Sequence, residues 1–230
     1  MLESIEQQKE KGLFEVLFVD NGSNDGTSAL IHSFIDGHPE LDCRVLVYVE
    51  KKSSYAARNF GVEHAKGDIF AFTDADCILR DDYIQNIVNV FSSLESQNLI
   101  LSGNIELMVE NPRNIWENFD QSSFLQNKSS HLVNKVATAN MVVSKETFFQ
   151  VGYFLEVRST GDSEWSQRSV QKGNKIEFHP DILVYHPTRK TFGEINKKFS
   201  RLGFGKGQRW KKGKWLLIIL YTLKIFNYKT

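Results

Sequence analysis

The chain of 230 residues is poor in cysteine and has no excess of charge of either sign. Its two cysteines, Cys43 and Cys77, are too few for a disulfide framework and lack the C-x-x-C spacing of many metal sites. A reducing cytoplasm is therefore the simpler setting. The 28 basic residues balance the 28 acidic residues, which argues against a nucleic-acid binder, because such domains are normally basic.

Long apolar runs are also missing. The strongest one, WLLIIL at residues 215–220, is far shorter than the roughly 20 residues that cross a membrane. It either lies in a membrane interface or begins a span that the chain does not contain. The polar first residues exclude a signal peptide. A hydrophobic fraction of 41% is enough for one buried core, so we expect one domain at residues 1–188 and a basic, aromatic segment at residues 189–230.

Apolar and helical patterns alternate along the first half of the chain. Strands are expected at residues 14–20, 43–50 and 68–77, and helices at residues 27–37, 55–66 and 82–94. This alternation predicts an α/β fold with a mostly parallel sheet and helices on both faces. The second half is less regular. Its clearest signals are a strand at residues 99–109, a helix after residue 161 and a strand pair around a proline turn at residues 175–186.

Two carboxylates, Asp74 and Asp76, follow the apolar segment FAFT. Extended residues i and i+2 point the same way, so both carboxylates can reach one divalent cation. Hard oxygen ligands suit Mg²⁺ or Mn²⁺, which keep positions open for substrate phosphates. The alternative is a pair of solvated aspartates in a turn. The expected carboxyl end of a strand favours the metal site, because ligands of open α/β sheets bind there.

Asp20 ends the first expected strand in the same way, so we expect it to face the same crevice and to bind a nucleobase or ribose. Further along this turn, Asp25 and Thr27 are as well explained by capping of the next helix. Arg58 lies on the helix before the third strand. Arg58 is either a charge-assisted donor to a diphosphate or a structural ion-pair partner, and the sequence does not decide between these two roles.

Four ordered segments carry a more specific signal. They are EVLFVDNGSNDGT, SYAARNFGVEHAKGDIFAFTDADC, ANMVVSKETFFQVGYF and GDSEW. Together, over about residues 14–186, they resemble inverting family-2 glycosyltransferases of the GT-A fold. The resemblance implies a Rossmann-like fold of the GT-A type and Mn²⁺ or Mg²⁺ as cofactor. It also implies transfer of a sugar from a nucleoside-diphosphate sugar, a UDP-sugar by default, to an acceptor hydroxyl.

The resemblance also implies site residues. Those expected to bind the nucleotide sugar are Asp20, Asn21, Arg58, Asn59 and Asp74. Those expected to bind the metal are Asp74, Asp76 and His186. Asp162 falls where the family has its general base, which takes the proton of the acceptor hydroxyl as that oxygen attacks the anomeric carbon. A single displacement of this kind inverts the anomeric configuration.

The sequence departs from the family pattern in two of these motifs. Gly161 stands where the family usually has a glutamate before its base, so Asp162 is alternatively the N-cap of the helix that follows, with Glu164 as a second candidate base. Asn21 replaces an aspartate that is common in the first motif. His186 is a metal ligand by analogy with some GT-A enzymes, although a lone histidine is more often structural.

The family normally has a further apolar strand before FEVLFVD, and we expect this strand to be missing here. Two alternatives therefore stay open, a nucleotidyltransferase of similar fold and a non-catalytic remnant. The family implies surface polysaccharide or glycolipid synthesis, with a saccharide or lipid-linked acceptor, in the cytoplasm and at the inner face of the cell membrane. The basic, aromatic segment 189–230 fits a membrane surface or a solvated face packed on the domain.

Overall fold

The computed structural model describes residues 1–93, 98–123 and 131–209, and its strands form two sheets. The smaller sheet is a parallel pair, β1 (Glu15–Asp20) and β2 (Asp42–Val47). The larger sheet has five strands in the order β3-β6-β5-β7-β4. These five are β3 (Ile69–Thr73), β4 (Ile78–Leu79), β5 (Leu99–Met108), β6 (Asn140–Ser144) and β7 (Lys175–Pro187).

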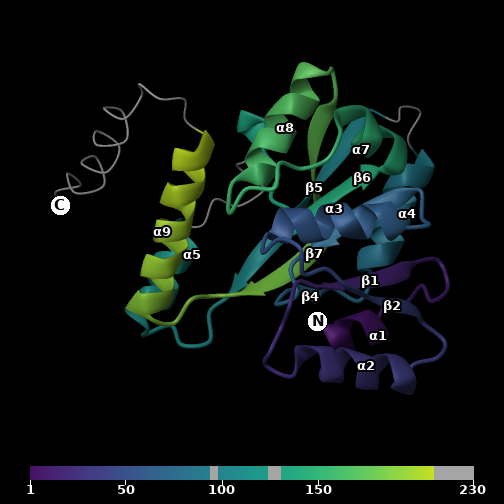
Figure 1. Ribbon diagram of the computed structural model, residues 1–230, viewed down its shortest axis with the longest axis horizontal. Coiled ribbons are helices and arrows are strands. Elements are labelled where there is room, and N and C mark those ends of the chain that lie inside the picture. The colour runs from purple at the N-terminus through teal and green to yellow at the C-terminus, as the bar shows by residue number, and fades with distance from the viewer. Residues whose placement is uncertain (94–97, 124–130, 210–230) are drawn as a thin grey trace.

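Helices surround both sheets (Figure 1). They are α1 (Leu2–Glu6), α2 (Thr27–Gly37), α3 (Ser54–His64), α4 (Tyr83–Ser93), α5 (Ile115–Ser123), α7 (Lys145–Val151), α8 (Gly161–Gln171) and α9 (Phe192–Arg209), with a short 3₁₀ helix at His131–Val133. Helix α9 lies beside α5 at one side of the molecule. It belongs to the basic, aromatic segment expected at residues 189–230. In the described part of the chain, no helix is both long enough and apolar enough to cross a membrane.

The expected α/β class is confirmed, but the expectation of a mostly parallel sheet is wrong. Of the strand pairs in the described part of the chain, only β1–β2 and β5–β7 are parallel. Strand β6 runs antiparallel to both of its neighbours, and β4 runs antiparallel to β7. Parallel neighbours need a long crossover, usually a helix, and the regular strand–helix alternation that supplies it is confined to the first half of the sequence.

The second half also corrects the strand pair that was expected around a proline turn. Residues 175–187 form one strand, and Pro180 falls at a register shift between β5 and β7. Gly103 pairs with His179 across this shift, whereas the next residue of β5 pairs with Leu183. Proline has no N–H to give to a ladder, so it is tolerated at such an irregularity without ending the strand.

A buried asparagine supports the register shift. The Asn140 side chain is fully buried and donates to the main-chain oxygens of Asn104 (2.7 Å) and Ile182 (2.9 Å), one on each of the two shifted strands. Its oxygen accepts from the Tyr83 hydroxyl at 3.1 Å. Buried carbonyls need partners, so this amide supplies bonds where the ladder is irregular. Gly103 provides the space for this amide, since a Cβ at position 103 would be 2.3 Å from the Asn140 amide nitrogen.

The two sheets differ in how completely they are covered. Strand β1 pairs with β2 alone, and β3 is the edge strand of the larger sheet. The side chains of residues 15–19 are only partly buried, whereas β6 is buried over residues 140–143. Among the residues that the structure describes, no strand pairs with the second edge of β1 or of β3. The expected absence of a strand before β1 stays a prediction.

Candidate functional site

The turn after β3 contains the two aspartates expected to bind a metal. Strand β3 ends at Thr73, so Asp74 and Asp76 lie in a turn and not in the extended segment that the sequence predicts. Their side chains take different partners. Asp74 Oδ1 is 2.5 Å from a guanidinium nitrogen of Arg58, while Asp76 is near His186. The metal role of Asp74 therefore stays a prediction. Asp76, in contrast, lies beside His186, the other residue expected to bind the metal.

The ion pair between Arg58 and Asp74 joins α3 to the turn after β3. Ser53 caps α3 by accepting from the N–H of Ala56, and Arg58 follows one turn later. The Arg58 side chain is 16% exposed and that of Asp74 is 37% exposed, so both still reach solvent. Ion pairing and diphosphate binding are thus compatible, because a guanidinium has five N–H donors and one carboxylate uses only part of them.

Within the described residues, one group has the geometry of a metal site: the possible ligand atoms of Asp76, Cys77 and His186 lie within 4.8 Å of one another. His186 Nε2 is 3.7 Å from Asp76 Oδ1, and His186 Nδ1 is 2.8 Å from the oxygen of Pro187. Donation from Nδ1 to this carbonyl leaves the lone pair of Nε2 directed to the side of Asp76. Metal-binding histidines are typically oriented by such a hydrogen bond.

Cys77 is the member of this group that the sequence did not suggest. Its side chain is fully buried, and burial raises the pKa of the thiol to about 12. A neutral thiol is a poor ligand for a hard cation such as Mn²⁺ or Mg²⁺. Cys77 packs in the core with Tyr83 and Ile105, so Asp76 and His186 are the two side chains suited to the metal.

Asp162 lies in the first turn of α8 and is half-buried. The alternative that it caps this helix is wrong, because the N-cap position belongs to Thr160. Asp162 Oδ1 accepts from the N–H of Ser163 at 2.8 Å. Glu164, the second candidate base, forms two hydrogen bonds with Arg168, at 3.0 and 3.1 Å. Among the described residues, Glu164 has a cationic side-chain partner and Asp162 has none.

The Tyr55 ring contacts both Arg58 of the charged pair and Gly161, the residue before Asp162. At Gly161 an added Cβ would be 2.9 Å from two carbons of this ring. The guanidinium carbon of Arg58 lies 5.6 Å from the centre of the same ring. The contacts from Gly161 through Tyr55 and Arg58 to Asp74 bring together residues from α8, α3 and the turn after β3. The sequence placed Tyr55 on a helix but gave no signal of this role.

Asp20 and Asn21 stand at the end of β1, and their hydrogen bonds are local. Asp20 is buried, and its carboxylate accepts from the N–H of Ser23 at 2.8 Å. Hydrogen bonds from Ser23 lower the pKa of Asp20, so it is ionised at neutral pH. The Asn21 amide donates to the oxygens of Tyr48 (2.6 Å) and Lys51 (2.9 Å) and accepts from the next loop. No described hydrogen bond or ion pair joins Asp20 to Asp74 or Asp76.

Asn59 has a structural role in the described contacts. Its buried amide donates to the main-chain oxygen of Phe154 at 2.9 Å and accepts from the N–H of the same residue at 3.0 Å. These bonds fasten α3 to the loop before α8. Direct contact of Asn59 with a nucleotide stays a prediction.

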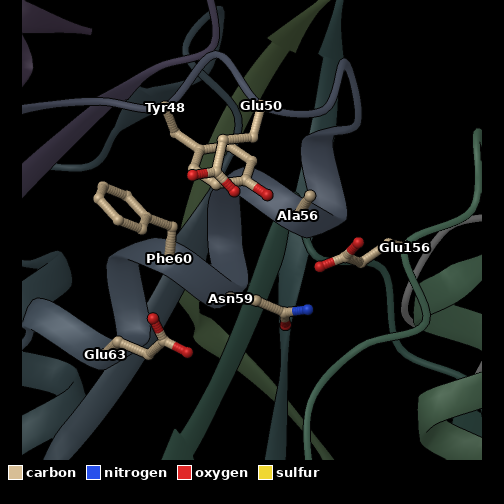
Figure 2. A pocket seen from close by; sticks show the side chains of 7 residues that line it. All are labelled: Tyr48, Glu50, Ala56, Asn59, Phe60, Glu63 and Glu156. Atoms are coloured by element: carbon tan, nitrogen blue, oxygen red, sulfur yellow. The ribbon is translucent and has the colours of Figure 1, made fainter.

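A cleft of about 320 Å³ opens on another face of α3 (Figure 2). It is lined by Tyr48, Glu50, Ala56, Asn59, Phe60, Glu63 and Glu156. Lys51 pairs with Glu156 at 2.7 Å, and the carboxylates of Glu50 and Glu63 add negative charge. Such a lining repels a pyrophosphate, so this cleft is not the place for the phosphates of a nucleotide. The sequence gave no sign of it.

Two buried acids on α5 also escaped sequence analysis. Asp120 is fully buried and accepts from Lys198 at 2.6 Å and from the Arg189 guanidinium at 3.0 Å. Glu117 accepts from the Thr188 hydroxyl at 2.7 Å. These contacts fix α9 and the segment before it onto α5. They also show that part of the basic segment after residue 188 packs on the domain.

Comparison with known proteins gives a consistent result. The model of the family described as glycosyl transferase family 2 matches residues 1–146. Glycosyltransferase AglE of Haloferax volcanii is 35% identical over 202 residues, which are 87% of this chain and 65% of AglE. A dolichyl N-acetyl-alpha-D-glucosaminyl phosphate 3-beta-D-2,3-diacetamido-2,3-dideoxy-beta-D-glucuronosyltransferase of Methanococcus voltae is 22% identical, with 94% of this chain and 70% of the relative covered.

Among solved structures, the chain is similar to the mannosyltransferase PcManGT from Pyrobaculum calidifontis, determined in complex with GDP-Man and Mn²⁺. The TM-score is 0.66 at 20% identity, over 92% of this chain and 60% of that one. The likeness confirms the expected GT-A fold. The chain spans about two thirds of the length of AglE and less of PcManGT, 65% and 60% respectively.

Proposed function

The chain belongs to glycosyl transferase family 2, and we propose that it transfers a sugar from a nucleoside-diphosphate sugar to an acceptor hydroxyl with inversion. The observation that carries this proposal is the grouping of chemically suitable side chains after β3. Asp76 lies near His186 there, Asp74 pairs with Arg58, and the Tyr55 ring contacts both Arg58 and Gly161, the residue before Asp162.

On the donor side, Arg58 is suited to bind the diphosphate, because its guanidinium already reaches the turn after β3. Asp20 is suited to the base or ribose, since it is an ionised acceptor at the end of a strand. Asn21 would act by holding the loop after β2 and the start of α3 in place. A UDP-sugar is the default donor, and GDP-Man, bound in the PcManGT structure, is the second to test.

A divalent cation fits the residues present. The oriented imidazole of His186 and the exposed carboxylate of Asp76 would hold Mn²⁺ or Mg²⁺, with Asp74 close by on the same turn. When bound, the cation would neutralise the charge that develops on the departing nucleoside diphosphate. Mn²⁺ is the cation in the PcManGT complex, which supports its choice as first probe.

On the acceptor side, Asp162 would take the proton of the acceptor hydroxyl while the oxygen attacks the anomeric carbon from the face opposite the leaving group. The bond from that carbon to the diphosphate oxygen breaks in the same step, so the configuration inverts. No described cation pairs with Asp162, which favours an available carboxylate. Arg58, which contacts the Tyr55 ring, and its partner Asp74 lie where the leaving group would be bound.

A donor-hydrolysis screen tests the activity. The full chain would be incubated with UDP-N-acetylglucosamine and with GDP-mannose, each with Mn²⁺ or with a chelator, and nucleotide release measured. We expect metal-dependent release from at least one donor, and a drop of about 10²–10⁴-fold in Asp162→Asn. Asp36→Asn, an exposed aspartate on α2, is the matched control and should be unchanged.

Three outcomes would contradict the proposal. Full activity in Asp162→Asn would remove the proposed base. Turnover only of a sugar phosphate with a nucleoside triphosphate, tested in parallel, would show a nucleotidyltransferase. Absence of both turnover and nucleotide binding would favour the non-catalytic remnant.

We further propose a lipid-linked acceptor at the cytoplasmic face of a membrane, in surface polysaccharide or glycolipid synthesis. The name of the Methanococcus voltae relative describes a dolichyl phosphate substrate, which supports this proposal. So do exposed side chains along α9: Phe192 is 60% exposed and Phe204 53% exposed, and the cations Lys197 and Arg201 of the same helix are exposed. Aromatic and basic side chains together favour an anionic membrane interface.

Co-sedimentation with vesicles tests the membrane proposal. The chain should pellet with vesicles that contain anionic lipid and less with neutral ones, and Phe192→Asp should reduce pelleting. Leu30→Asp is the control, because Leu30 is 62% exposed on α2, far from α9. Equal pelleting of both variants would leave α9 without a role in membrane binding.

A further inference from the structure

Helix α9 runs from α5 toward the segment that leads into α8 (Figure 1). Gly205, in the last turns of α9, is buried, and a Cβ built on it would be 2.6 Å from the main-chain oxygen of Ser159 and 2.7 Å from its Cβ. Arg158 makes a second contact, because its guanidinium carbon lies 5.5 Å from the centre of the Phe204 ring. The last turns of α9 therefore pack directly on the segment before α8.

Glycine is needed at position 205 because of the space beside it. Its backbone is not in the left-handed region, so conformation alone would admit another residue. Atoms in ordinary contact are about 3.5–4.0 Å apart, so a methyl group here would move the helix or the segment by about 1 Å. Gly203 gives the contrast: it is exposed, and no described heavy atom lies within 4 Å of a Cβ built there. Residues two apart in a helix point in nearly opposite directions, so Gly205 faces the segment and Gly203 faces away.

The segment that contacts α9 has a strained backbone. Thr160 has φ +65° and ψ +16°, in the left-handed region where residues other than glycine are uncommon. Such a conformation persists only when its surroundings hold it, and Thr160 is the N-cap of α8, two residues before Asp162. From the side of α3, the Ser53 hydroxyl donates to the oxygen of Val157 at 3.0 Å. From the other side, α9 lies against Ser159.

Helix α9 is itself attached to the domain. About two turns before Gly205, the Lys198 ammonium group donates to the Asp120 carboxylate at 2.6 Å, and this carboxylate is fully buried. Ile195, about one turn earlier, is 4% exposed. A helix has a fixed rise of about 1.5 Å per residue, so this attachment also determines where Gly205 lies.

We propose that α9 positions Asp162 through the contact of Gly205 with Ser159. The contact holds Thr160 in its left-handed conformation, and this conformation sets where α8 begins and where the Asp162 carboxylate lies. The inference rests on the proposed function of Asp162 as the base. A base must lie within hydrogen-bond distance of the hydroxyl that it deprotonates, and a misplacement of about 1 Å can cost about a hundredfold in rate. Gly205 is in this sense a positioning residue.

The test compares Gly205→Ala with Gly203→Ala, which adds the same methyl group to the opposite side of the same helix. The first measurement is hydrogen–deuterium exchange of peptic peptides that cover residues 157–164, and it does not depend on turnover. Gly205→Ala should speed this exchange several-fold, because a displaced contact lets Thr160 leave its strained conformation. Gly203→Ala should exchange as the wild type does. Unchanged or slower exchange in Gly205→Ala would overturn the proposal.

Phe204→Ala is a second variant, for the case that the added methyl group disturbs the whole fold. It removes the ring that Arg158 contacts and adds no atom, so the fold should persist. Exchange over residues 157–164 should exceed that of the wild type by less than in Gly205→Ala, and peptides of β6 should stay protected. Wild-type exchange over 157–164 in Phe204→Ala, or a rise that includes β6, would contradict a local role of α9.

The second measurement is nucleotide release from UDP-N-acetylglucosamine and GDP-mannose with Mn²⁺. Gly205→Ala should lower kcat about ten- to hundredfold and leave the donor KM nearly unchanged, because the displaced segment contains neither Arg58 nor Asp74. In the Asp162→Asn background the same substitution should cause little further loss, since two changes that act on one group are not additive. A purely structural defect would lower the activity in both backgrounds by the same factor.

The outcomes separate the positioning role from the proposed function. Full activity of Asp162→Asn contradicts the base itself. A deficient Asp162→Asn together with a normal Gly205→Ala contradicts only the positioning role. Losses that multiply in the double variant also contradict it, because α9 would then act on a group other than Asp162.

Discussion

The five-stranded sheet and the β1–β2 pair differ in burial, although both begin as apolar stretches of sequence. Leu101 in β5 is fully buried, whereas Leu17 in β1 is only partly buried, and β1 pairs on one edge alone. The larger sheet supports Asp74, Asp76, His186 and, through α8, Asp162. The smaller one supports Asp20. The side proposed to bind metal and acceptor is thus the more deeply buried one, and we expect a bound ligand to stabilise the side proposed to bind the nucleoside more strongly.

The largest effect on stability is expected for Asp120, the buried residue of α5 that pairs with Lys198 of α9. Burial alone would raise the pKa of Asp120, but hydrogen bonds from Lys198 and Arg189 outweigh it and the pKa is lowered. Asp120→Asn leaves Lys198 buried without its anion, and burial already lowers the pKa of that lysine. We expect a loss of about 3–5 kcal/mol in the free energy of unfolding at pH 7.

The pH dependence of this loss follows from the direction of the shift. A carboxyl group with a lowered pKa stabilises the fold above its unfolded pKa of about 3.9, and the contribution disappears as the pH falls through the folded value. The penalty of Asp120→Asn should therefore be constant near neutrality and shrink below about pH 4. Urea unfolding at several pH values measures it. A penalty that does not change with pH would mean that the charge of Asp120 is not responsible.

A matched pair of substitutions tests the contrast between the sheets directly. Leu101→Ala should lower the free energy of unfolding by about 2–5 kcal/mol, as expected for a fully buried leucine. Leu17→Ala should cost less than half of that value, since the Leu17 side chain is only partly buried and the substitution removes less buried apolar surface. Chemical denaturation of both variants is sufficient. Equal losses would show that the two sheets form one equally packed core.

The buried amide at the register shift gives a smaller effect. Asn140→Ala removes the donors to Asn104 and Ile182 and leaves the Tyr83 hydroxyl without its acceptor. The expected loss is about 1–3 kcal/mol, the range for unsatisfied buried polar groups. Asn89→Ala, on the surface of α4, is the control. A neutral result for Asn140→Ala would mean that water replaces the amide.

The smallest expected effect is a difference in local opening. Amides of β1 and β2 should exchange with deuterium faster than those of β5 and β6, because fewer buried contacts oppose their opening. Adding GDP or UDP with Mn²⁺ should slow exchange in β1 more than in β5. Mass spectrometry of peptic peptides resolves the two sheets. Equal protection of both sheets would remove the contrast.

The sequence predicted much of the fold because its first half follows a simple alternation. The helix over 27–37 and the strand from 99 lie where the apolar pattern indicates. The antiparallel direction of β6 could not be predicted this way, since strand direction depends on how the chain returns to the sheet. Pro180 led to the wrong prediction of a turn for a related reason. The sequence shows that proline cannot donate to a ladder, but it does not show that Asn140, 40 positions earlier, supplies hydrogen bonds at the register shift.

The site shows the same division. Motifs in the sequence pointed to Asp76 and His186, and the structure brings them within 3.7 Å of each other. The sequence also predicted that Asp74 and Asp76 point the same way, which fails because the strand ends before them. Tyr55 was not found, because its importance lies in a contact with Gly161 that is more than 100 residues away in the chain. Spacing along a sequence reports local geometry, whereas this contact depends on the packing of α8 against α3.

Calorimetric titration with GDP and UDP tests the proposed cation and nucleotide site most directly. Each nucleotide would be added to the wild-type chain with Mn²⁺, to the same chain with EDTA, and to Asp76→Asn and Asp36→Asn with Mn²⁺. The expected result is binding of at least one nucleotide that requires Mn²⁺, persists in Asp36→Asn and is lost in Asp76→Asn. Binding that is unaffected by EDTA and by Asp76→Asn would contradict a metal-dependent site at this turn.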